Sequence, residues 1–244
     1  MSEFSNKVIV ITGGYKGNGL AIVENFINNN AKVYSLDSKY PKKKEINGKL
    51  VKLKTKIDSF KQIKNIINEI GRKEKKIDVL INNAGISLKL SKKNILSHWN
   101  KTIATNLTAP YLLSLLCLPY LKKSKQSSIV NITSLNGKIA MSNNPAYNAS
   151  KGGLSALTFC LAMDFSKYSI RVNGVSPGYI KTDMTKKSLN NKYEFKKRIN
   201  RMMIPKYGSP KDIADAVFFL ASKNAGYINA TEIVVDGGLL KKGI

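Results

Sequence analysis

The chain has 244 residues, 43% of them hydrophobic and 23% charged, which is the composition of a globular protein with one substantial core. It carries 41 Lys and Arg against 15 Asp and Glu, a net charge of +26, and 37 of the 41 are lysines. Because these lysines are spread along the whole chain and form no arginine-rich stripe, the charge argues against a dedicated nucleic-acid-binding role.

The sequence also argues against export, membrane insertion and metal binding. The stretch "MSEFSNKVIVITGG" has no basic region followed by an apolar run, so no secretory signal is expected. The most apolar segment, Ala109–Leu121, is too short to cross a bilayer and predicts a buried helix. Cys117 and Cys160 are expected to be buried thiols of a reducing cytoplasm. His98 has no Cys or carboxylate cluster nearby, so no metal site is expected. Together, these features predict a cytoplasmic protein without a membrane partner.

Short β-branched runs alternate with stretches of helical spacing along the chain. The predicted strands are Lys7–Thr12, Lys32–Asp37, Lys49–Lys54, Asp78–Asn83, Ser128–Thr133, Ile170–Ser176 and Thr231–Asp236. The predicted helices are Gly19–Asn29, Phe60–Gly71, His98–Leu121, Tyr147–Tyr168 and Pro210–Ser222. Several strands are apolar almost throughout, as expected when helices cover both faces of a parallel sheet. The pattern predicts one doubly wound α/β domain of Rossmann type over residues 1–244, with a seven-stranded parallel sheet and ligands beyond the carboxyl ends of its strands.

The turn after the first predicted strand, "TGGYKGNG", indicates a dinucleotide site. Gly13, Gly17 and Gly19 allow a tight turn, a close approach of the backbone to pyrophosphate and helix amides that point at the anion. The second strand ends at Asp37, whose carboxylate can accept hydrogen bonds from both ribose hydroxyls and repel a 2′-phosphate. Asp37 therefore favours NAD, whereas the cation of Lys16 favours NADP, and we give Asp37 the greater weight.

Polar residues follow the fourth and fifth strands as well. The "NNAG" turn after the fourth strand suits a backbone close to a ligand. Ser134 follows the fifth strand, and Tyr147 and Lys151 then lie one turn apart on one face of a predicted helix. The chain contains four Tyr-x-x-x-Lys pairs, but only this one follows such a strand and serine.

In this order and at these spacings, "TGGYKGNG", Asp37, "NNAG", Asn106, Ser134, "YNASK", "SPGYIKT" and "VDGG" resemble the short-chain dehydrogenase/reductase family over essentially the whole chain. The resemblance implies a catalytic set of Asn106, Ser134, Tyr147 and Lys151. The cofactor contacts that it implies are Gly13, Tyr15, Lys16, Gly17, Asn18, Gly19, Asp37, Ile57, Asn83, Ala84, Gly85, Tyr147, Lys151, Pro177, Gly178, Ile180 and Thr182.

Two positions depart from the family pattern. Asn18 stands where the family usually has isoleucine or leucine beneath the nicotinamide. Lys56 and Ile57 stand where the family usually has Asp-Val against the adenine, and Asp58 is expected to cap the following helix.

The implied chemistry is an alcohol–ketone interconversion. As a base at neutral pH, Tyr147 needs its pKa lowered by about 3 from a reference near 10, which corresponds to roughly 4 kcal/mol. The cation of Lys151 and the positive nicotinamide ring both favour the phenolate, which takes the hydroxyl proton while hydride leaves the same carbon. Ser134 would hold the substrate oxygen, and Asn106 would anchor a water that links Lys151 to solvent.

The substrate side is rich in cations. The family resemblance implies that Lys181–Lys206 form a lid over the substrate. This segment contains nine Lys and Arg in 26 residues, against two acids. One hypothesis is a substrate with a carboxylate, phosphate or sulfonate met by Lys89, Lys138, Arg198 and Arg201. The alternative is a solvated, lysine-rich surface without a ligand.

The sequence therefore predicts an NAD(H)-dependent oxidoreductase of a small secondary alcohol such as a sugar or hydroxy acid. An NADPH-dependent 3-oxoacyl-carrier-protein reductase is the first alternative, with Asp37 against it and Lys16 for it. A non-catalytic nucleotide- or RNA-binding protein is the second, and the Ser134, Tyr147 and Lys151 set speaks against it. The resemblance also implies a homotetramer that uses two apolar helices, Ala104–Leu121 and Tyr147–Tyr168, and the last strand.

Overall fold

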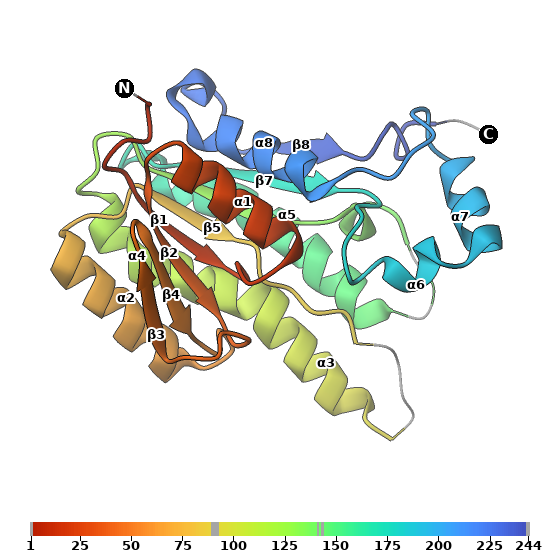
Figure 1. Cartoon of the computed structure of the whole chain (residues 1–244), viewed down its shortest axis with the longest axis horizontal. Coiled ribbons are helices and arrows are strands. Elements are labelled where there is room, and N and C mark those ends of the chain that lie inside the picture. The colour runs from red at the N-terminus through yellow and green to blue at the C-terminus, as the bar shows by residue number, and fades with distance from the viewer. Residues whose placement is uncertain (1, 89–92, 141, 143, 243–244) are drawn as a thin grey trace.

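The computed structural model describes residues 2–88, 93–140, 142 and 144–242 (Figure 1). Its strands form one eight-stranded sheet in the order β3-β4-β2-β1-β5-β6-β7-β8. Only β3 and β4 pair antiparallel, so the predicted doubly wound α/β fold of Rossmann type is confirmed. The strands are β1 (Val8–Thr12), β2 (Lys32–Asp37), β3 (Lys44–Asn47), β4 (Leu50–Lys54), β5 (Val79–Asn82), β6 (Ser128–Ile132), β7 (Arg171–Pro177) and β8 (Glu232–Val235).

The prediction of seven parallel strands is wrong in one respect, because β3 adds an antiparallel strand at the edge of the sheet. β3 has 4 residues, three of them exposed, so it shows neither an apolar run nor an alternating pattern. Gly48, with φ +56°, turns the chain back into β4. The pair Glu45–Lys52, at 2.8 Å, joins the two strands. A short, charged edge strand of this kind discourages pairing with other chains.

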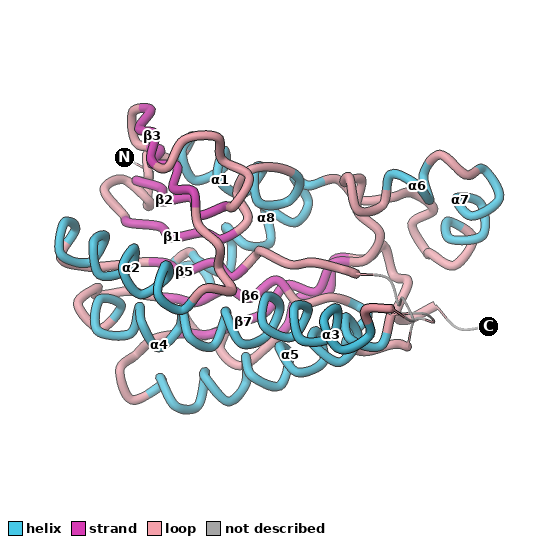
Figure 2. The backbone as a smooth tube through the Cα atoms, turned by 90° about the horizontal axis from the view of Figure 1, so that it is seen from below, coloured by secondary structure: helices cyan, strands magenta, loops and turns pink. Residues whose placement is uncertain are grey.

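Helices cover both faces of the sheet. Figure 2 shows α1 and α8 along one face and α2, α4 and α5 along the other, with α6 and α7 at one end of the molecule. The helices are α1 (Gly17–Asn28), α2 (Phe60–Glu74), α3 (Ile95–Ile103), α4 (Ala109–Leu121), α5 (Pro145–Ser166), α6 (Lys186–Leu189), α7 (Lys192–Ile199) and α8 (Pro210–Ala221), with 3-10 turns η2 (Leu135–Gly137) and η3 (Lys223–Ala225) and a π turn η1 (Ala104–Thr108).

The central strand β1 shows why the strands are apolar throughout. Val8 and Val10 belong to the core cluster under α2, α4 and α5, whereas Ile9 and Ile11 belong to the cluster under α1 and α8. All four side chains are at most 3% exposed. Burying a side chain of this size contributes about 1.5–3 kcal/mol. The strand is therefore packed on both faces. The glycine loop, Thr12–Gly19, follows directly from its carboxyl end.

The predicted apolar helix is longer than expected, because α3, η1 and α4 form one run, Ile95–Leu121. With 27 residues, this run is long and apolar enough to cross a membrane by length and composition alone. Leu113, Cys117 and Leu121 nevertheless lie in the core beside the sheet, so its apolar character is accounted for by the α/β fold. Cys117 is buried as predicted. Cys160 is exposed, because it lies on the outer side of α5 beside exposed Phe159 and Met163, so that prediction is wrong.

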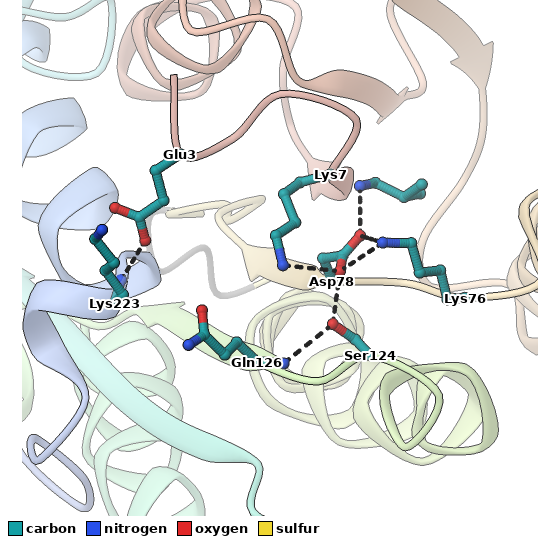
Figure 3. Close-up of polar contacts among 8 residues, drawn as sticks. Glu3, Lys7, Lys76, Asp78, Ser124, Gln126 and Lys223 are labelled. Carbon is teal, nitrogen blue, oxygen red and sulfur yellow. Dashed lines mark hydrogen bonds and ion pairs between the residues drawn. The ribbon is translucent and has the colours of Figure 1, made fainter. Parts of the chain in front are cut away.

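A buried carboxylate, Asp78, joins elements at the amino ends of the strands (Figure 3). It accepts hydrogen bonds from the backbone N–H of Val8 at 2.8 Å and the hydroxyl of Ser124 at 2.6 Å. It also forms ion pairs with Lys76 at 3.0 Å and Lys7 at 3.5 Å. These contacts connect β1, β5 and the segment after α4 on the side of the sheet opposite the carboxyl ends.

Candidate active site

The glycine loop after β1 packs directly against the "NNAG" turn after β5. Gly13 has φ +71°, and a Cβ there would lie 2.8 Å from the Cα of Ala84. A Cβ on Gly19, in the first turn of α1, would lie 2.0 Å from the carbonyl oxygen of Gly13. Gly17 has φ +58°, and its Cβ would lie 3.5 Å from Thr182 Cγ2 after β7. Only glycine fits the first two positions, and the loop thereby presents the N-terminus of α1 at the carboxyl edge of the sheet.

The Asn83 side chain holds this loop from the neighbouring strand. Its Nδ2 donates to the carbonyl oxygens of Thr12 at 2.9 Å and Gly13 at 3.0 Å. In return, the Thr12 hydroxyl accepts the backbone N–H groups of Asn83 and Ala84, both at 3.1 Å. The structure therefore brings together the predicted residues after β1 and β5, and Asn83 shapes the loop through its amide.

Asp37, at the end of β2, lies beside the other end of the glycine loop. Its carboxylate accepts the backbone N–H of Tyr15 at 3.2 Å and that of Lys39 at 2.9 Å. The Tyr15 ring lies edge-on to the ring of Tyr40, with centroids 5.6 Å apart. The carboxylate is thus fixed next to the loop, where a ribose at this end of a dinucleotide would meet it.

Lys16 forms an ion pair with Asp183. Its Nζ lies 2.6 Å from Oδ2 of Asp183, at the start of the predicted lid. The Asp183 carboxylate raises the pKa of Lys16, and Lys16 in turn lowers the pKa of Asp183. The cation that favoured NADP in the sequence is therefore already paired within the protein.

Ser134, Tyr147 and Lys151 converge beyond β6. The side chain of Ser134 lies close enough to the Tyr147 hydroxyl to favour its phenolate. The Lys151 Nζ lies 5.9 Å from the centroid of the Tyr147 ring and donates to the carbonyl oxygen of Ile132 at 2.6 Å. Lys151 is 3% exposed, and its ammonium has no carboxylate partner within the described part of the chain.

Burial dominates the titration of this pair. Burial raises the pKa of Tyr147, while the hydrogen bond from Ser134 opposes the rise. Burial also lowers the pKa of Lys151 to about 8. Among the protein's own groups, the direction for Tyr147 is opposite to the one that base catalysis needs, so the tyrosine requires a further positive charge close by.

Asn106 lies in the π turn η1 and is fully buried. Its Oδ1 accepts the backbone N–H of Ile86 at 2.8 Å, and its Nδ2 donates to the carbonyl oxygen of Ile86 at 2.9 Å and to Ser150 Oγ at 3.0 Å. A Cβ on Gly85 would lie 3.5 Å from both Asn106 Oδ1 and Lys151 Nζ. The amide therefore connects the segment after β5 to the helix that carries Tyr147 and Lys151.

The segment after β7 closes the other side. A Cβ on Gly178 would lie 2.7 Å from the Cα of Asp236, so the segment packs tightly on the "VDGG" turn. Ile180 is buried, and the backbone N–H of Thr182 donates to Thr185 Oγ1 at 3.1 Å. Pro177, one of the cofactor contacts that the family resemblance implies, ends β7.

Comparisons with known proteins identify the family of this chain. A family model described as enoyl-(acyl carrier protein) reductase matches residues 13–240. The chain belongs to the short-chain dehydrogenase/reductase family. It is 33% identical to the 3-oxoacyl-[acyl-carrier-protein] reductase FabG of Chlamydia pneumoniae over 96% of each chain, and 36% identical to an uncharacterized oxidoreductase of Thermotoga maritima over 98% of this chain and 97% of the relative. A structure of Thermoplasma acidophilum aldohexose dehydrogenase, 30% identical, superposes with a TM-score of 0.91 over 99% of this chain and 97% of that one.

Members of the short-chain dehydrogenase/reductase family are NAD(P)-dependent oxidoreductases acting on CH–OH groups, and this chain is one of them. Its residues fit a dinucleotide. Side chains on Gly13 and Gly19 would clash with the "NNAG" turn and with the loop's own backbone, so only glycine lets the loop adopt the tight turn that pyrophosphate requires. Asn18 Oδ1 and Ser176 Oγ are buried without a hydrogen-bond partner among the described residues, and a bound ligand commonly satisfies such atoms at a site.

Two of the residues that depart from the family pattern, Lys56 and Ile57, have structural partners. Ile57 is 9% exposed and packs in the core cluster beside β4 and α2, and the backbone N–H of Lys56 donates to Gln62 Oε1 at 2.9 Å. Asp58 is not the cap that the sequence predicts, because α2 has Ser59 at its N-cap position and no side-chain cap bond there.

Two of the four basic residues predicted to meet an anionic substrate are engaged within the protein. Lys138 forms an ion pair with the buried carboxylate of Glu232. Arg198 pairs with Glu194 at 3.5 Å and lies 4.8 Å from the ring centroid of Tyr179. Arg201 is exposed, and Lys89 lies outside the described residues.

Sequence reasoning missed Asp183, Glu232 and Ser155, which fasten predicted site residues. Asp183 follows Thr182 directly, so its place after β7 was a signal for it. Glu232 and Ser155 carry no such signal, since neither residue follows the carboxyl end of a strand.

Proposed function

We propose that the protein is an NAD(H)-dependent oxidoreductase that interconverts a small secondary alcohol, such as a sugar or hydroxy acid, and its ketone. The supporting observation is that Ser134 lies beside Tyr147, with Lys151 Nζ 5.9 Å from the centroid of the tyrosine ring. The dinucleotide, when bound, accepts or returns the hydride. Tyr147 takes the proton of the substrate hydroxyl in oxidation and returns it to the carbonyl oxygen in reduction.

The other three residues keep that proton transfer in place. Ser134 holds the substrate oxygen next to the Tyr147 hydroxyl. Lys151, with a pKa of about 8, is mostly protonated at pH 7, and its charge favours the phenolate that burial disfavours. Asn106 positions α5 through Ser150 and carries a water that links Lys151 to solvent.

Tyr147→Phe tests this assignment. The variant is expected to lose at least about a thousandfold in kcat, because the proton donor and acceptor are gone. NAD⁺ affinity, measured by titration calorimetry, stays within about twofold, since the ring and the Lys151 amine remain. Wild type and variant are assayed with a panel of sugars, hydroxy acids and simple secondary alcohols. Near-normal turnover in the variant would exclude Tyr147 as the proton-transfer group.

We propose NAD over NADP because of Asp37. Its carboxylate is fixed beside the glycine loop by Tyr15 and Lys39, and a 2′-phosphate there would meet a like charge. Lys16, which would attract that phosphate, is paired with Asp183. Calorimetric Kd values for NAD⁺ and NADP⁺ are compared in wild type and Asp37→Asn. We expect the preference for NAD⁺ to shrink at least about tenfold, which is roughly 1.4 kcal/mol. An unchanged ratio would remove Asp37 as the selector.

NADPH-dependent 3-oxoacyl-carrier-protein reduction is the second candidate, and the similarity to the Chlamydia pneumoniae reductase favours it. Reduction of an acetoacetyl thioester with NADPH at a higher kcat/KM than any free alcohol or sugar gives with NAD⁺ would select it. The basic lid, about residues 181–206, keeps Arg201 as an exposed cation that is available to an anionic substrate group.

We further propose a cytoplasmic homotetramer built on α4, α5 and β8. Large apolar side chains are exposed on all three elements, with Tyr111 and Leu115 on α4, Phe159 and Met163 on α5 and Val234 on β8. An exposed apolar surface of this kind is typical of an interface between subunits. Light scattering of wild type and Met163→Glu tests the proposal, and a monomeric wild-type protein would contradict it.

A further inference from the structure

The outer parallel strand of the sheet, β8, contains a buried carboxylate. The Glu232 side chain is only 3% exposed. Its register partner on β7 is Gly174, and a Cβ on Gly174 would lie 2.7 Å from Glu232 Cγ. The absence of a side chain on Gly174 therefore makes the room in which Glu232 lies against the body of the protein.

The carboxylate of Glu232 makes two contacts, in two directions. Its Oε1 accepts a hydrogen bond from Ser155 Oγ at 2.7 Å, and the other oxygen forms an ion pair with Lys138 Nζ. Ser155 lies one turn after Lys151 in α5 and also donates to the Lys151 carbonyl oxygen at 3.2 Å. Lys138 is the C-cap of η2, whose N-cap is Ser134. One buried charge is thus connected to both elements that carry the proposed catalytic groups.

The two elements also touch through their backbones. A Cβ on Gly137, in η2, would lie 2.9 Å from the carbonyl carbon and oxygen of Lys151 and from the backbone nitrogen of Gly152. A shift of η2 along α5 therefore moves Ser134 relative to Tyr147 and Lys151. Because hydrogen bonds weaken steeply with distance and angle, a small shift is enough to weaken the Ser134–Tyr147 contact.

We propose that Lys138, Glu232 and Ser155 form a charge clamp that holds η2 against α5 and thereby positions Ser134 for proton transfer at Tyr147. Lys138 and Glu232 are positioning residues and do not contact the reacting atoms. The proposal rests on the catalytic roles given above for Ser134 and Tyr147. It replaces the earlier hypothesis that Lys138 binds an anionic substrate.

Paired substitutions test the clamp. Glu232→Gln and Lys138→Met each leave one sheltered charge without its partner, whereas the double variant removes both charges. With D-glucose and NAD⁺ well below the melting temperature, each single variant is expected to lose at least about tenfold in kcat, with KM and the Kd for NAD⁺ within about twofold. The double variant is expected to regain most of the lost kcat. The control, Lys211→Met, breaks the exposed pair Lys211–Asp215 and is expected to leave kcat, KM and the Kd for NAD⁺ unchanged.

Two variants that keep both charges guard against misfolding of the charge variants. Ser155→Ala removes the bond to α5, and Gly174→Ala pushes Glu232 aside. Both are expected to reproduce the loss in kcat. If these variants or the single charge variants keep wild-type kcat, or if the double variant is no better than the worse single one, the clamp has no positioning role.

Backbone amide hydrogen exchange in η2 tests the clamp independently of turnover. The N–H groups of Gly137, Lys138 and Ile139 bond within the η2 turn. In Glu232→Gln we expect their exchange to accelerate at least about tenfold, while the amides of α8 keep their rates. Unchanged exchange in η2 would overturn the proposal, whatever the assay shows. If no sugar, hydroxy acid or simple secondary alcohol of the panel is oxidised, or if Tyr147→Phe keeps activity, the proposed function fails, and the exchange rates still decide the clamp.

Discussion

Replacing Lys151 with methionine is expected to stabilise the protein at pH 7 while removing its activity. The amine is 3% exposed, and burial lowers its pKa from 10.5 to about 8. That fall corresponds to about 3 kcal/mol of disfavoured charge in the folded state. The lost hydrogen bond to the Ile132 carbonyl oxygen offsets about 1 kcal/mol, so a net gain of roughly 1–3 kcal/mol remains.

The pH dependence of this gain has a defined sign. Below pH 8 the lysine is protonated in both states, and the folded state bears the full penalty of the buried charge. Between about pH 8 and 10.5 the folded state releases its proton while the unfolded state keeps it, so wild-type stability rises relative to the variant. The advantage of Lys151→Met is therefore full at pH 7 and fades as the pH approaches 10.

Urea unfolding at pH 7, 8.5 and 10 measures this difference. The control is Lys61→Met, which removes the same charge from an exposed position of α2 and corrects for the high net charge. The melting temperature of Lys151→Met at pH 7 should rise by roughly 2–10 °C for a chain of this size. A variant less stable than the control at pH 7, or a gain that does not shrink with pH, would refute the burial argument.

Asp78→Asn is expected to lower the free energy of unfolding by about 2–4 kcal/mol, because Lys7 and Lys76 lose a buried partner. Asp215→Asn removes an exposed carboxylate with the same change in net charge and should lower it by less than about 1 kcal/mol. Equal losses in urea unfolding would contradict the difference in burial. Gly19→Ala should weaken NAD⁺ binding at least about a hundredfold by calorimetry, since its Cβ would lie 2.0 Å from a carbonyl oxygen that shapes the loop. Gly48→Ala has a positive φ but open space around it and should bind normally, so equal effects would point to backbone strain alone.

The sheet could be predicted from the sequence wherever burial makes a strand apolar. All seven predicted strands are present, because helices on both faces leave them almost no polar positions. β3 escaped prediction because Lys44 and Asn47 are exposed and Glu45 is only half-buried, so the strand has no buried apolar face. The Asn47-Gly48 pair is typical of a hairpin turn. It predicts a hairpin only when alternating apolar residues flank it, and they do not do so here.

The site was predictable where a residue follows a strand, since neighbouring parallel strands bring their carboxyl ends together. Asp37 and Asn83 lie at that edge and contact the glycine loop, and Ser134 lies there beside Tyr147 of α5. The π turn that places Asn106 has no pattern of its own in the sequence, because its five residues continue the helical run between α3 and α4 without a break.

The roles of individual lysines were the part that could not be predicted, and the reason is numerical. With 41 basic residues against 15 acids, most cations have no acid to pair with, so a lysine near the site carries little information by itself. The position of each of the few acids gives more information about the site. Asp183 engages Lys16 and Glu232 engages Lys138, and both contacts depend on strand order and register. In so basic a chain, a carboxylate withdrawn from solvent is expected to have a positional role, and Glu232, buried between η2 and α5, is the one that adjoins the proposed catalytic groups.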